Sequence, residues 1–159
     1  MSAVMNTSAV TWRALQLADL ERVLVVEAQA YPFPWTQGNF IDAIAAGYDA
    51  ECLDDAQNGL IGYHVSLVGV DEMHLLNLTV TPTLQRRGFG QLLLERVIAR
   101  AKALGLQTLW LEVRASNLAA LALYRGRGFA DVATRPAYYP GAAGQREAAQ
   151  VMRLPLAMP

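Results

Sequence analysis

The sequence has little of several features that mark specialised classes of protein. It contains one cysteine, Cys52, among 159 residues, so an internal disulfide is impossible. Its formal net charge is -1, so there is no global basic field for nucleic acid, and we expect no direct nucleic-acid partner. Its longest uncharged apolar stretch, residues 60–70, is interrupted by glycine and polar residues and is too short to span a bilayer.

The amino-terminal stretch 1–7 also lacks the basic and apolar regions of a signal peptide. We therefore expect a cytoplasmic protein that does not enter a membrane. With 53% hydrophobic and 17% charged residues, the chain is typical of a folded globule. Its length fits one domain over residues 1–159, with a core spanning about 11–156.

Hydrophobic periodicity predicts a mixed order of strands and helices. Strands are expected at 11–16, 48–53, 60–70, 75–81, 107–114, 129–134 and 147–156, and helices at 19–30, 36–46, about 90–104 and 118–125. A hairpin turn is expected at 54–59 and a long loop at 135–144. The pattern indicates a single α/β domain with a mixed, mostly antiparallel sheet and helices on both faces.

The stretch from 75 to 103 predicts a strand, a loop and a helix. Pro82 ends the strand, and the loop reads Gln-Arg-Arg-Gly-Phe-Gly over 85–90. Backbone N–H groups at a helix start attract anions, and Gly88 and Gly90 let a ligand approach the backbone closely. The stretch therefore predicts a pyrophosphate seat, with an ordinary strand-to-helix turn as the alternative.

Two common phosphate-binding motifs do not fit this loop. A P-loop needs Lys and Ser or Thr where Gln91 and Leu92 follow Gly90, and a dinucleotide fingerprint needs glycine where Leu93 stands. Gln85, Gly88 and Gly90 instead form the pattern Gln/Arg-x-x-Gly-x-Gly/Ala. This pattern after a strand resembles the acetyl-coenzyme A motif of the GNAT acetyltransferases.

Two residues beyond this stretch could carry acid–base chemistry. Glu112 lies within an apolar strand that we expect to be covered on both faces, where a carboxylate needs a partner or shifts its pKa upward. A raised pKa suits a general base, whereas pairing with Arg114 or another cation is the structural alternative. Tyr124, near the end of a short helix whose buried stripe holds Leu118, Leu121 and Ala122, is either a packing aromatic or a proton donor.

Other candidates have stronger structural explanations. Asn117 is a good helix N-cap, although a cap residue can also turn toward a ligand. Cys52 lies on an early strand without a nearby histidine, so nucleophilic use is not favoured. His64 and His74 show no metal-ligand spacing, and we expect no metal. Phe33 and Trp35 flank Pro34 in a loop and either cover the core or line a groove.

Three stretches together identify a narrower family. Residues 109–117, Leu-Trp-Leu-Glu-Val-Arg-Ala-Ser-Asn, followed by 122–124 and 128–129, resemble the RimI family, the ribosomal-protein alanine N-acetyltransferases. The stretches 33–35, 77–80 and 138–140 are also similar to that family. The resemblance covers about residues 11–156.

The resemblance implies an acetyl-coenzyme A-dependent N-acetyltransferase in which Glu112 is the general base and Tyr124 the general acid. The acetyl group would pass directly to the amine, without an acyl-enzyme. The residues expected to bind the co-substrate are Leu78, Thr79 and Val80 through their backbone, Arg86, Arg87, Gly88, Phe89, Gly90 and Gln91 at the pyrophosphate, and Asn117 at the pantetheine.

The resemblance also implies a substrate, the alanine α-amine of a small-subunit ribosomal protein. Phe33, Trp35, Tyr138 and Tyr139 fall on two proline-bearing loops, and a groove between such loops would admit an extended chain end. Two alternatives stay open, a lysine or small-amine acetyltransferase on the same fold and a non-catalytic acyl-coenzyme A binding module. The sequence does not give the oligomeric state.

Overall fold

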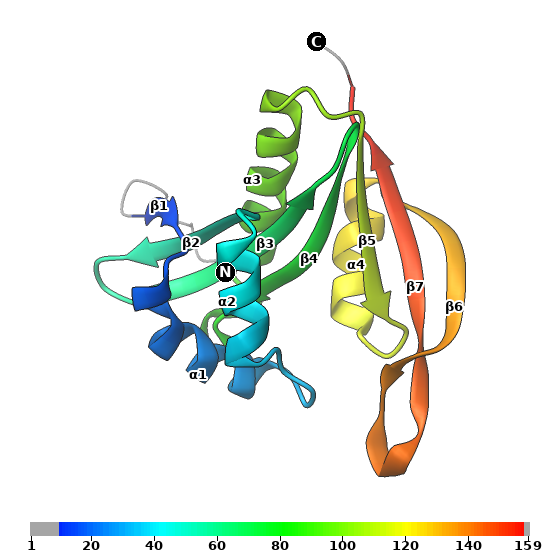
Figure 1. Cartoon of the computed structure of the whole chain (residues 1–159), viewed down its shortest axis with the longest axis horizontal. Helices are drawn as coiled ribbons and strands as arrows, with labels where there is room; N and C mark the ends of the chain where they lie inside the picture. Colours follow the sequence, from blue (N-terminus) through cyan, green and yellow to red (C-terminus); the bar gives the residue numbers. More distant parts are fainter. Residues whose placement is uncertain (1–9, 158–159) are drawn as a thin grey trace. The chain divides into compact units, whose positions relative to one another are not determined.

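The computed structural model describes residues 10–157 (Figure 1). The stretch 1–7, where the sequence predicts no signal peptide, lies outside the described residues. The helices and strands, in chain order, are β1 Val10–Ala14, α1 Leu20–Ala30, α2 Gln37–Ala45, β2 Asp49–Asp55, β3 Gly59–Val68, β4 Glu72–Val80, α3 Phe89–Ala103, β5 Thr108–Arg114, α4 Leu118–Arg127, β6 Ala130–Pro140 and β7 Arg146–Pro155. Short 3-10 turns lie at Leu17–Asp19, Pro82–Leu84 and Ala142–Gly144.

The strands form one seven-stranded sheet in the order β1-β2-β3-β4-β5-β7-β6. β4 and β5 run parallel, through the register of Glu72–Leu75 against Thr108–Leu111. The pairs β1–β2, β2–β3, β5–β7 and β7–β6 are antiparallel. The predicted mixed, mostly antiparallel α/β sheet is therefore confirmed.

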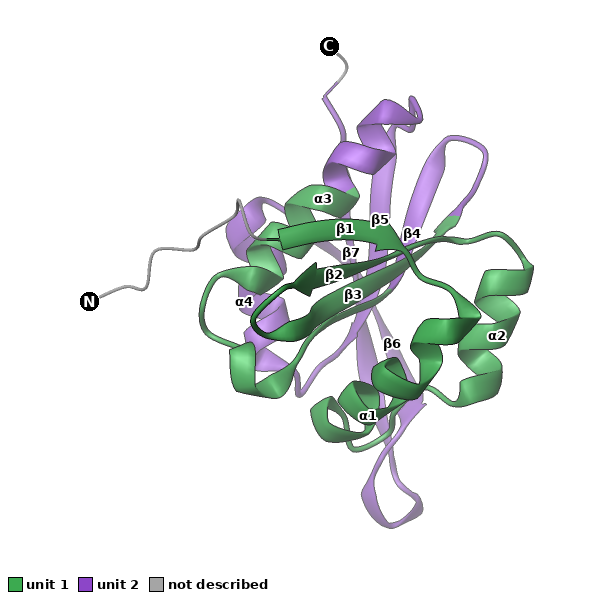
Figure 2. Ribbon diagram, turned by 90° about the vertical axis from the view of Figure 1, so that its left-hand side faces the viewer, with its two compact units in different colours: residues 1–67, 77–97 green, residues 68–76, 98–159 purple. Residues whose placement is uncertain are grey.

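The chain divides into two compact units that interleave in sequence (Figure 2). Unit 1 holds residues 1–67 and 77–97, and unit 2 holds 68–76 and 98–159. β4 and α3 each contribute residues to both units. The prediction of a single domain over 1–159 stays a prediction, and each unit is described by itself below.

Unit 1 is built around α1, α2 and the first three strands. Thr36 caps α2, because its Oγ1 accepts from the Asn39 amide at 3.1 Å while Asn39 Oδ1 accepts from the Thr36 amide at 2.9 Å. Gly47 follows the helix at a φ of 75°, in the left-handed region that glycine tolerates best. Both ends of α2 therefore lie close to where the sequence predicts them.

A buried carboxylate organises the centre of unit 1. Glu27 is 1% exposed and comes from α1. Its Oε1 accepts from Tyr63 Oη at 2.9 Å, Asn77 Nδ2 at 2.7 Å and Thr79 Oγ1 at 3.4 Å. Its Oε2 accepts from the Trp35 amide at 2.8 Å. Glu27 thus joins α1 to the α1–α2 loop, β3 and the carboxyl-terminal part of β4, because the loop and β3 each supply one of its donors and β4 supplies two.

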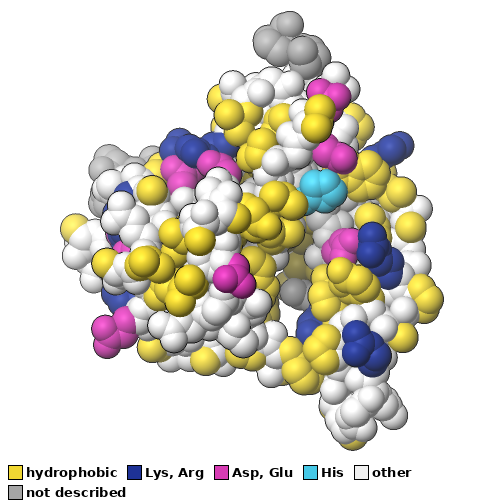
Figure 3. All heavy atoms as spheres, in the orientation of Figure 1, with side chains coloured by type: hydrophobic (Ala, Val, Ile, Leu, Met, Phe, Trp, Pro, Cys, Tyr) yellow, Lys and Arg dark blue, Asp and Glu magenta, His cyan; other side chains and the backbone are white. Residues whose placement is uncertain are grey.

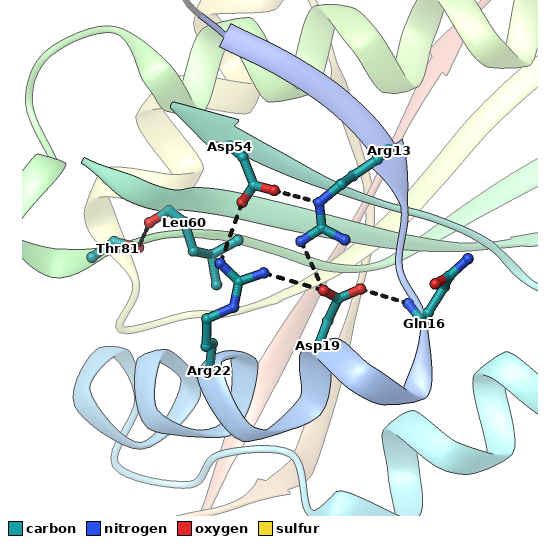
Figure 4. Close-up of polar contacts among 7 residues, drawn as sticks. All are labelled: Arg13, Gln16, Asp19, Arg22, Asp54, Leu60 and Thr81. Carbon is teal, nitrogen blue, oxygen red and sulfur yellow. Dashed lines mark hydrogen bonds and ion pairs between the residues drawn. The ribbon is translucent and has the colours of Figure 1, made fainter. Parts of the chain in front are cut away.

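A second ionic group joins β1, β2 and α1 (Figure 4). Asp19 Oδ1 lies 2.7 Å from Arg13 Nη2 and 3.2 Å from Arg22 Nη2. Arg13 Nε and Arg22 also contact the carboxylate of Asp54. Asp19 Oδ2 accepts from the Gln16 amide at 2.8 Å, so this residue fixes the turn before α1 instead of capping the helix with its side chain.

Unit 2 shows where the sequence expectations need correction. β5 is buried on one face only, through Leu109, Leu111 and Val113, so Glu112 lies on the half-open face and not in a strand covered on both sides. In α4 the buried residues are Leu121 and Tyr124, whereas Leu118 and Ala122, expected in the buried stripe, are exposed. The helix therefore turns a different face inward, which places the Tyr124 ring in the interior.

The prediction of a loop at 135–144 is also wrong for most of that range. β6 continues to Pro140 and pairs with β7 as a long hairpin, the orange and red strands of Figure 1. The pairing is irregular between Arg135 and Tyr139, and Ala137 has a φ of 51°. Pro136 falls inside this irregular part. A proline is compatible with an irregular edge strand, although in the sequence it suggests a loop.

We predict that Glu27→Ala lowers the free energy of unfolding by about 3 kcal/mol, because it leaves several buried donors without an acceptor. Urea unfolding followed by circular dichroism measures the change. Glu21→Ala, an exposed glutamate on the same helix, is the matched control and should change stability by less than about 0.5 kcal/mol. Equal effects of the two substitutions would contradict a structural role for the buried carboxylate.

Candidate functional site

The start of α3 has the geometry of an anion-binding helix end. The first i→i−4 bond of α3 runs from the Leu92 amide to the Gly88 carbonyl at 3.1 Å, so the amides of residues 89–91 precede it. Gly88 has a φ of 87° and Arg86 a φ of 64°, an uncommon conformation for a residue with a side chain. Such conformations concentrate at functional sites.

The residues predicted to bind the pyrophosphate differ in their exposure. Arg86, Arg87, Gly88 and Gln91 are exposed, and Gly90 is half-buried. Phe89 is 8% exposed and belongs to a core cluster with Leu53, Ile61, Val80, Leu84 and Leu93. The Phe89 side chain therefore anchors the start of α3 in the core. Only the backbone amide of Phe89 is available for the predicted binding of a pyrophosphate.

The end of β4 is held firmly in unit 1. The Leu78 carbonyl accepts from Tyr31 Oη at 3.0 Å, and the Val80 carbonyl accepts from Gln85 Nε2 at 3.3 Å. Thr81 Oγ1 donates to the Leu60 carbonyl at 2.7 Å, as Figure 4 shows. The Thr79 and Val80 side chains are buried, so a ligand at the end of β4 would contact mainly the backbone.

Two residues of β6, Arg135 and Tyr138, lie beside Glu112 of β5. Its Oε1 lies 3.2 Å from Arg135 Nη2, and its side chain is 27% exposed. A hydrogen bond to this carboxylate raises the pKa of the Tyr138 hydroxyl. The cation beside Glu112 is Arg135, so the predicted alternative of pairing with Arg114 or another cation is met by a residue of β6. The carboxylate remains accessible to solvent.

Arg114 has a different partner on β7. Its Nη1 lies 3.0 Å from Glu147 Oε1 and donates to the Pro140 carbonyl at 2.7 Å, while its guanidinium is 4.6 Å from the Tyr139 ring centre. Burial raises the pKa of Tyr139 to about 12. Tyr139 is thus a half-buried packing residue held by Arg114, whereas Tyr138 is 40% exposed.

The turn between β5 and α4 is tied to the same glutamate. Glu147 accepts from the Ser116 amide at 3.2 Å and from Ser116 Oγ at 3.0 Å. The hydrogen bonds from Arg114 and Ser116 hold the pKa of Glu147 below its ordinary value. Asn117 follows and caps α4, because its Oδ1 accepts from the Ala120 amide at 3.1 Å. The capping function predicted for Asn117 is confirmed.

Tyr124 lies in the interior of unit 2. It is 7% exposed, and its ring centre is 5.6 Å from that of Phe129 at an interplanar angle of 59°. The packing explanation therefore holds for its ring, and its role as a proton donor stays a prediction. Glu112, Tyr124 and Asn117 belong to one unit together with Tyr138 and Tyr139.

The aromatics of the α1–α2 loop belong to unit 1 and differ from each other. Trp35 packs against the core beside Phe40, with ring centres 5.1 Å apart, and its amide binds Glu27. Phe33 is 41% exposed. Trp35 therefore has a structural explanation, whereas Phe33 has an exposed side chain, and its contact with a substrate stays a prediction.

The two histidines, His64 and His74, have structural explanations. His64 is buried with Nε2 3.0 Å from Glu51 Oε1, and Arg96 donates two hydrogen bonds of 2.9 Å to Glu51. His74 is half-exposed and stacks on Trp110.

Across residues 10–157, no three His, Cys, Asp or Glu side chains are placed to hold a metal ion. Within the same range no helix is long and apolar enough to cross a membrane.

The charged surface consists largely of local pairs. On the face shown in Figure 3, dark-blue basic side chains appear at separate points, several of them beside magenta carboxylates. Among the described residues, Arg125 lies 2.7 Å from Asp131, and Arg114 lies 3.0 Å from Glu147. These neighbours locally balance part of the basic charge.

Sequence reasoning missed Glu27, Arg135 and Glu147. A signal existed for Glu27, because it falls seven residues after Leu20 and four after Val23, on the apolar stripe of α1. A carboxylate at such a position needs buried donors. No comparable signal existed for Arg135 or Glu147, whose contacts depend on the register of β6 and β7.

We predict that Cys52 reacts with Ellman's reagent at pH 8 only after unfolding. Burial raises the pKa of its thiol to about 12, so about 10⁻⁴ of it is thiolate at this pH. The absorbance rise should be at least about 100-fold slower in the native protein than in urea. Rapid labelling of the native protein would reopen Cys52 as a nucleophile.

Comparison with known proteins agrees with these observations. Residues 20–129 match the acetyltransferase (GNAT) family. The [ribosomal protein bS18]-alanine N-acetyltransferase of Salmonella typhimurium is 39% identical over 97% of this chain and 100% of its own length. The enzyme of the same name from Escherichia coli K12 is 40% identical over 93% and 99%.

The crystal structure of the ribosomal-protein-S18-alanine N-acetyltransferase from Escherichia coli has the same fold. It superposes with a TM-score of 0.86 and 38% identity, covering 94% of this chain and 96% of its own. The resemblance to the RimI family is therefore confirmed along nearly the whole chain. The chain belongs to the GNAT acetyltransferase family.

Proposed function

We propose that this protein transfers the acetyl group of acetyl-coenzyme A to the α-amine of an alanine-ended small-subunit ribosomal protein. The observation that carries the proposal is the accessible carboxylate of Glu112, which lies on the half-open face of β5 beside Tyr138. The names of the relatives support the same reaction and substrate. Such a substrate is made in the cytoplasm, where we expect the enzyme to act.

The proposed reaction is a direct transfer. Glu112 accepts a proton from the substrate ammonium, and the free amine attacks the thioester carbonyl. A backbone N–H of residues 78–80 stabilises the oxyanion, and Tyr124 protonates the leaving coenzyme A thiolate. No acyl-enzyme is required. The buried thiol of Cys52 agrees with this, because its pKa of about 12 makes it a poor nucleophile.

The residues at the start of α3 fit a coenzyme A pyrophosphate. The amides of residues 89–91 precede the first intrahelical bond, Arg86 and Arg87 supply positive charge, and Gly88 and Gly90 leave the backbone uncovered. The backbone of residues 78–80 would bind the pantetheine arm, because Thr79 and Val80 turn their side chains into the interior. Asn117, the cap of α4, is a further residue that the resemblance to the RimI family assigns to pantetheine binding.

We predict that Gly90→Val abolishes acetyl-coenzyme A binding while the protein stays folded. The new side chain would stand at the first turn of α3, where the phosphates are expected to approach. Isothermal titration calorimetry gives the affinity, and circular dichroism checks the fold. Ala99→Val, at an exposed position later in the same helix, is the matched control. Unchanged affinity in a folded Gly90→Val protein would refute the assignment.

We predict that Glu112→Gln lowers kcat by about 10²- to 10⁴-fold, because it removes the base and keeps the shape. Tyr124→Phe should also slow turnover and largely keep acetyl-coenzyme A binding. Coenzyme A release detected with a thiol reagent measures both rates. Wild-type rates in both variants, under conditions where the chemical step is limiting, would show that the assigned roles are wrong.

We predict that an alanine-ended peptide is acetylated faster than the same peptide with a blocked terminus and one free lysine. An α-amine titrates near pH ~8, against ~10.4 for lysine, so it is easier to deprotonate at neutral pH. Mass spectrometry of a mixture of both peptides gives the ratio directly. Equal or faster acetylation of the lysine peptide would favour the lysine acetyltransferase alternative.

A further inference from the structure

The base proposed above is already engaged by a cation of its own chain. Arg135 Nη2 lies 3.2 Å from Glu112 Oε1, and the guanidinium is 5.2 Å from the ring centre of Tyr138. The neighbouring Glu112 carboxylate raises the pKa of the Tyr138 hydroxyl. The side chains of Arg135 and Glu112 are 55% and 27% exposed, so molecules in solution can reach the ion pair.

The irregular part of β6 places Arg135 and Tyr138 next to Glu112. Arg135 pairs with Ala149 of β7, and Tyr139 pairs with Glu147. Three residues of β6 therefore stand opposite one residue of β7, which is a bulge in the ladder. A bulge redirects side chains from the strict alternation of a strand, and here Arg135 and Tyr138 turn toward the same carboxylate.

The bulge is held in place by a separate arginine. Arg146 Nε donates to the Ala137 carbonyl at 2.9 Å, and its Nη2 donates to the Tyr138 carbonyl at 2.7 Å. Ala137 has a φ of 51°, a conformation that needs support from its surroundings. Because Arg146 supports the backbone of the bulge, Arg135 is not needed for that purpose. Its side chain can leave Glu112 without opening the hairpin.

We propose that Arg135 occupies the place of the substrate ammonium on Glu112 and is displaced by it when a peptide binds. This inference rests on the function proposed above and makes Arg135 a positioning residue that selects for a free amino terminus. A half-exposed ion pair is weak, so an incoming ammonium can replace the guanidinium at little cost. An acetylated terminus has no cation, so Arg135 returns to Glu112 and the product leaves.

The direct test follows the Arg135 side chain by NMR. The Nε–H signal of Arg135 in nitrogen-15-labelled protein is assigned by its loss in Arg135→Lys. An alanine-ended peptide, added with coenzyme A, should shift or broaden this signal, whereas the same peptide with an acetylated terminus should leave it unchanged. An equal response to both peptides, or a response to neither, would overturn the proposal.

Kinetics give a second test. Arg135→Gln removes the competing cation, so the KM for the alanine-ended peptide should fall about two- to five-fold, with the KM for acetyl-coenzyme A unchanged. Arg135→Lys should restore the wild-type KM. Arg125→Gln, which removes an exposed arginine paired with Asp131 at 2.7 Å, is the matched control and should change neither KM.

The two proposals fail in different ways. An unchanged or higher peptide KM in Arg135→Gln, or the same KM in the Lys and Gln variants, would overturn the role of Arg135 while acetyl transfer stands. If the wild-type protein acetylates no peptide, the proposed function itself fails. The NMR signal of Arg135 then still decides whether a free ammonium displaces the guanidinium.

Discussion

The hydrogen bonds to the Glu27 carboxylate are the constraint on which unit 1 depends. A carboxylate removed from water is costly unless donors surround it, and here they come from β3, β4 and the α1–α2 loop. Burial and the negative charge of Glu27 raise the pKa of Tyr63, so its phenol stays protonated and keeps donating. The positions of α1 and of the end of β4 are therefore coupled through one side chain. Any ligand that uses the β4 backbone depends on this coupling.

Unit 2 uses exposed and half-exposed ion pairs where unit 1 uses a buried carboxylate. Glu147 fixes the β5–α4 turn, Arg114 holds Tyr139, and Arg146 supports the bulge in β6. Such contacts are individually weak in water, so they set positions more than they stabilise the fold.

The sequence predicts the order of the helices and strands and, except for the long β6, their approximate bounds, because apolar periodicity, proline and glycine mark them locally. The helix cap at Asn117 and the loop of Phe33 were predictable for the same reason. It does not predict that Glu112 lies on a half-open face, because that depends on which face of β5 the helices cover. Nor does it predict that Tyr138 lies on a strand, since Pro136 suggests a loop and the pairing with β7 is a long-range property. The catalytic and binding roles of the site residues stay predictions.

The bulge in β6 has a consequence for how the protein behaves at high concentration. β6 is the outer strand of the sheet, and an unpaired strand edge invites hydrogen bonding by a second copy of the chain. The two prolines Pro136 and Pro140 cannot donate to such a ladder, and the bulge interrupts the flat edge that a partner strand would need. The irregularity that aims Arg135 at Glu112 thus also discourages edge-to-edge aggregation.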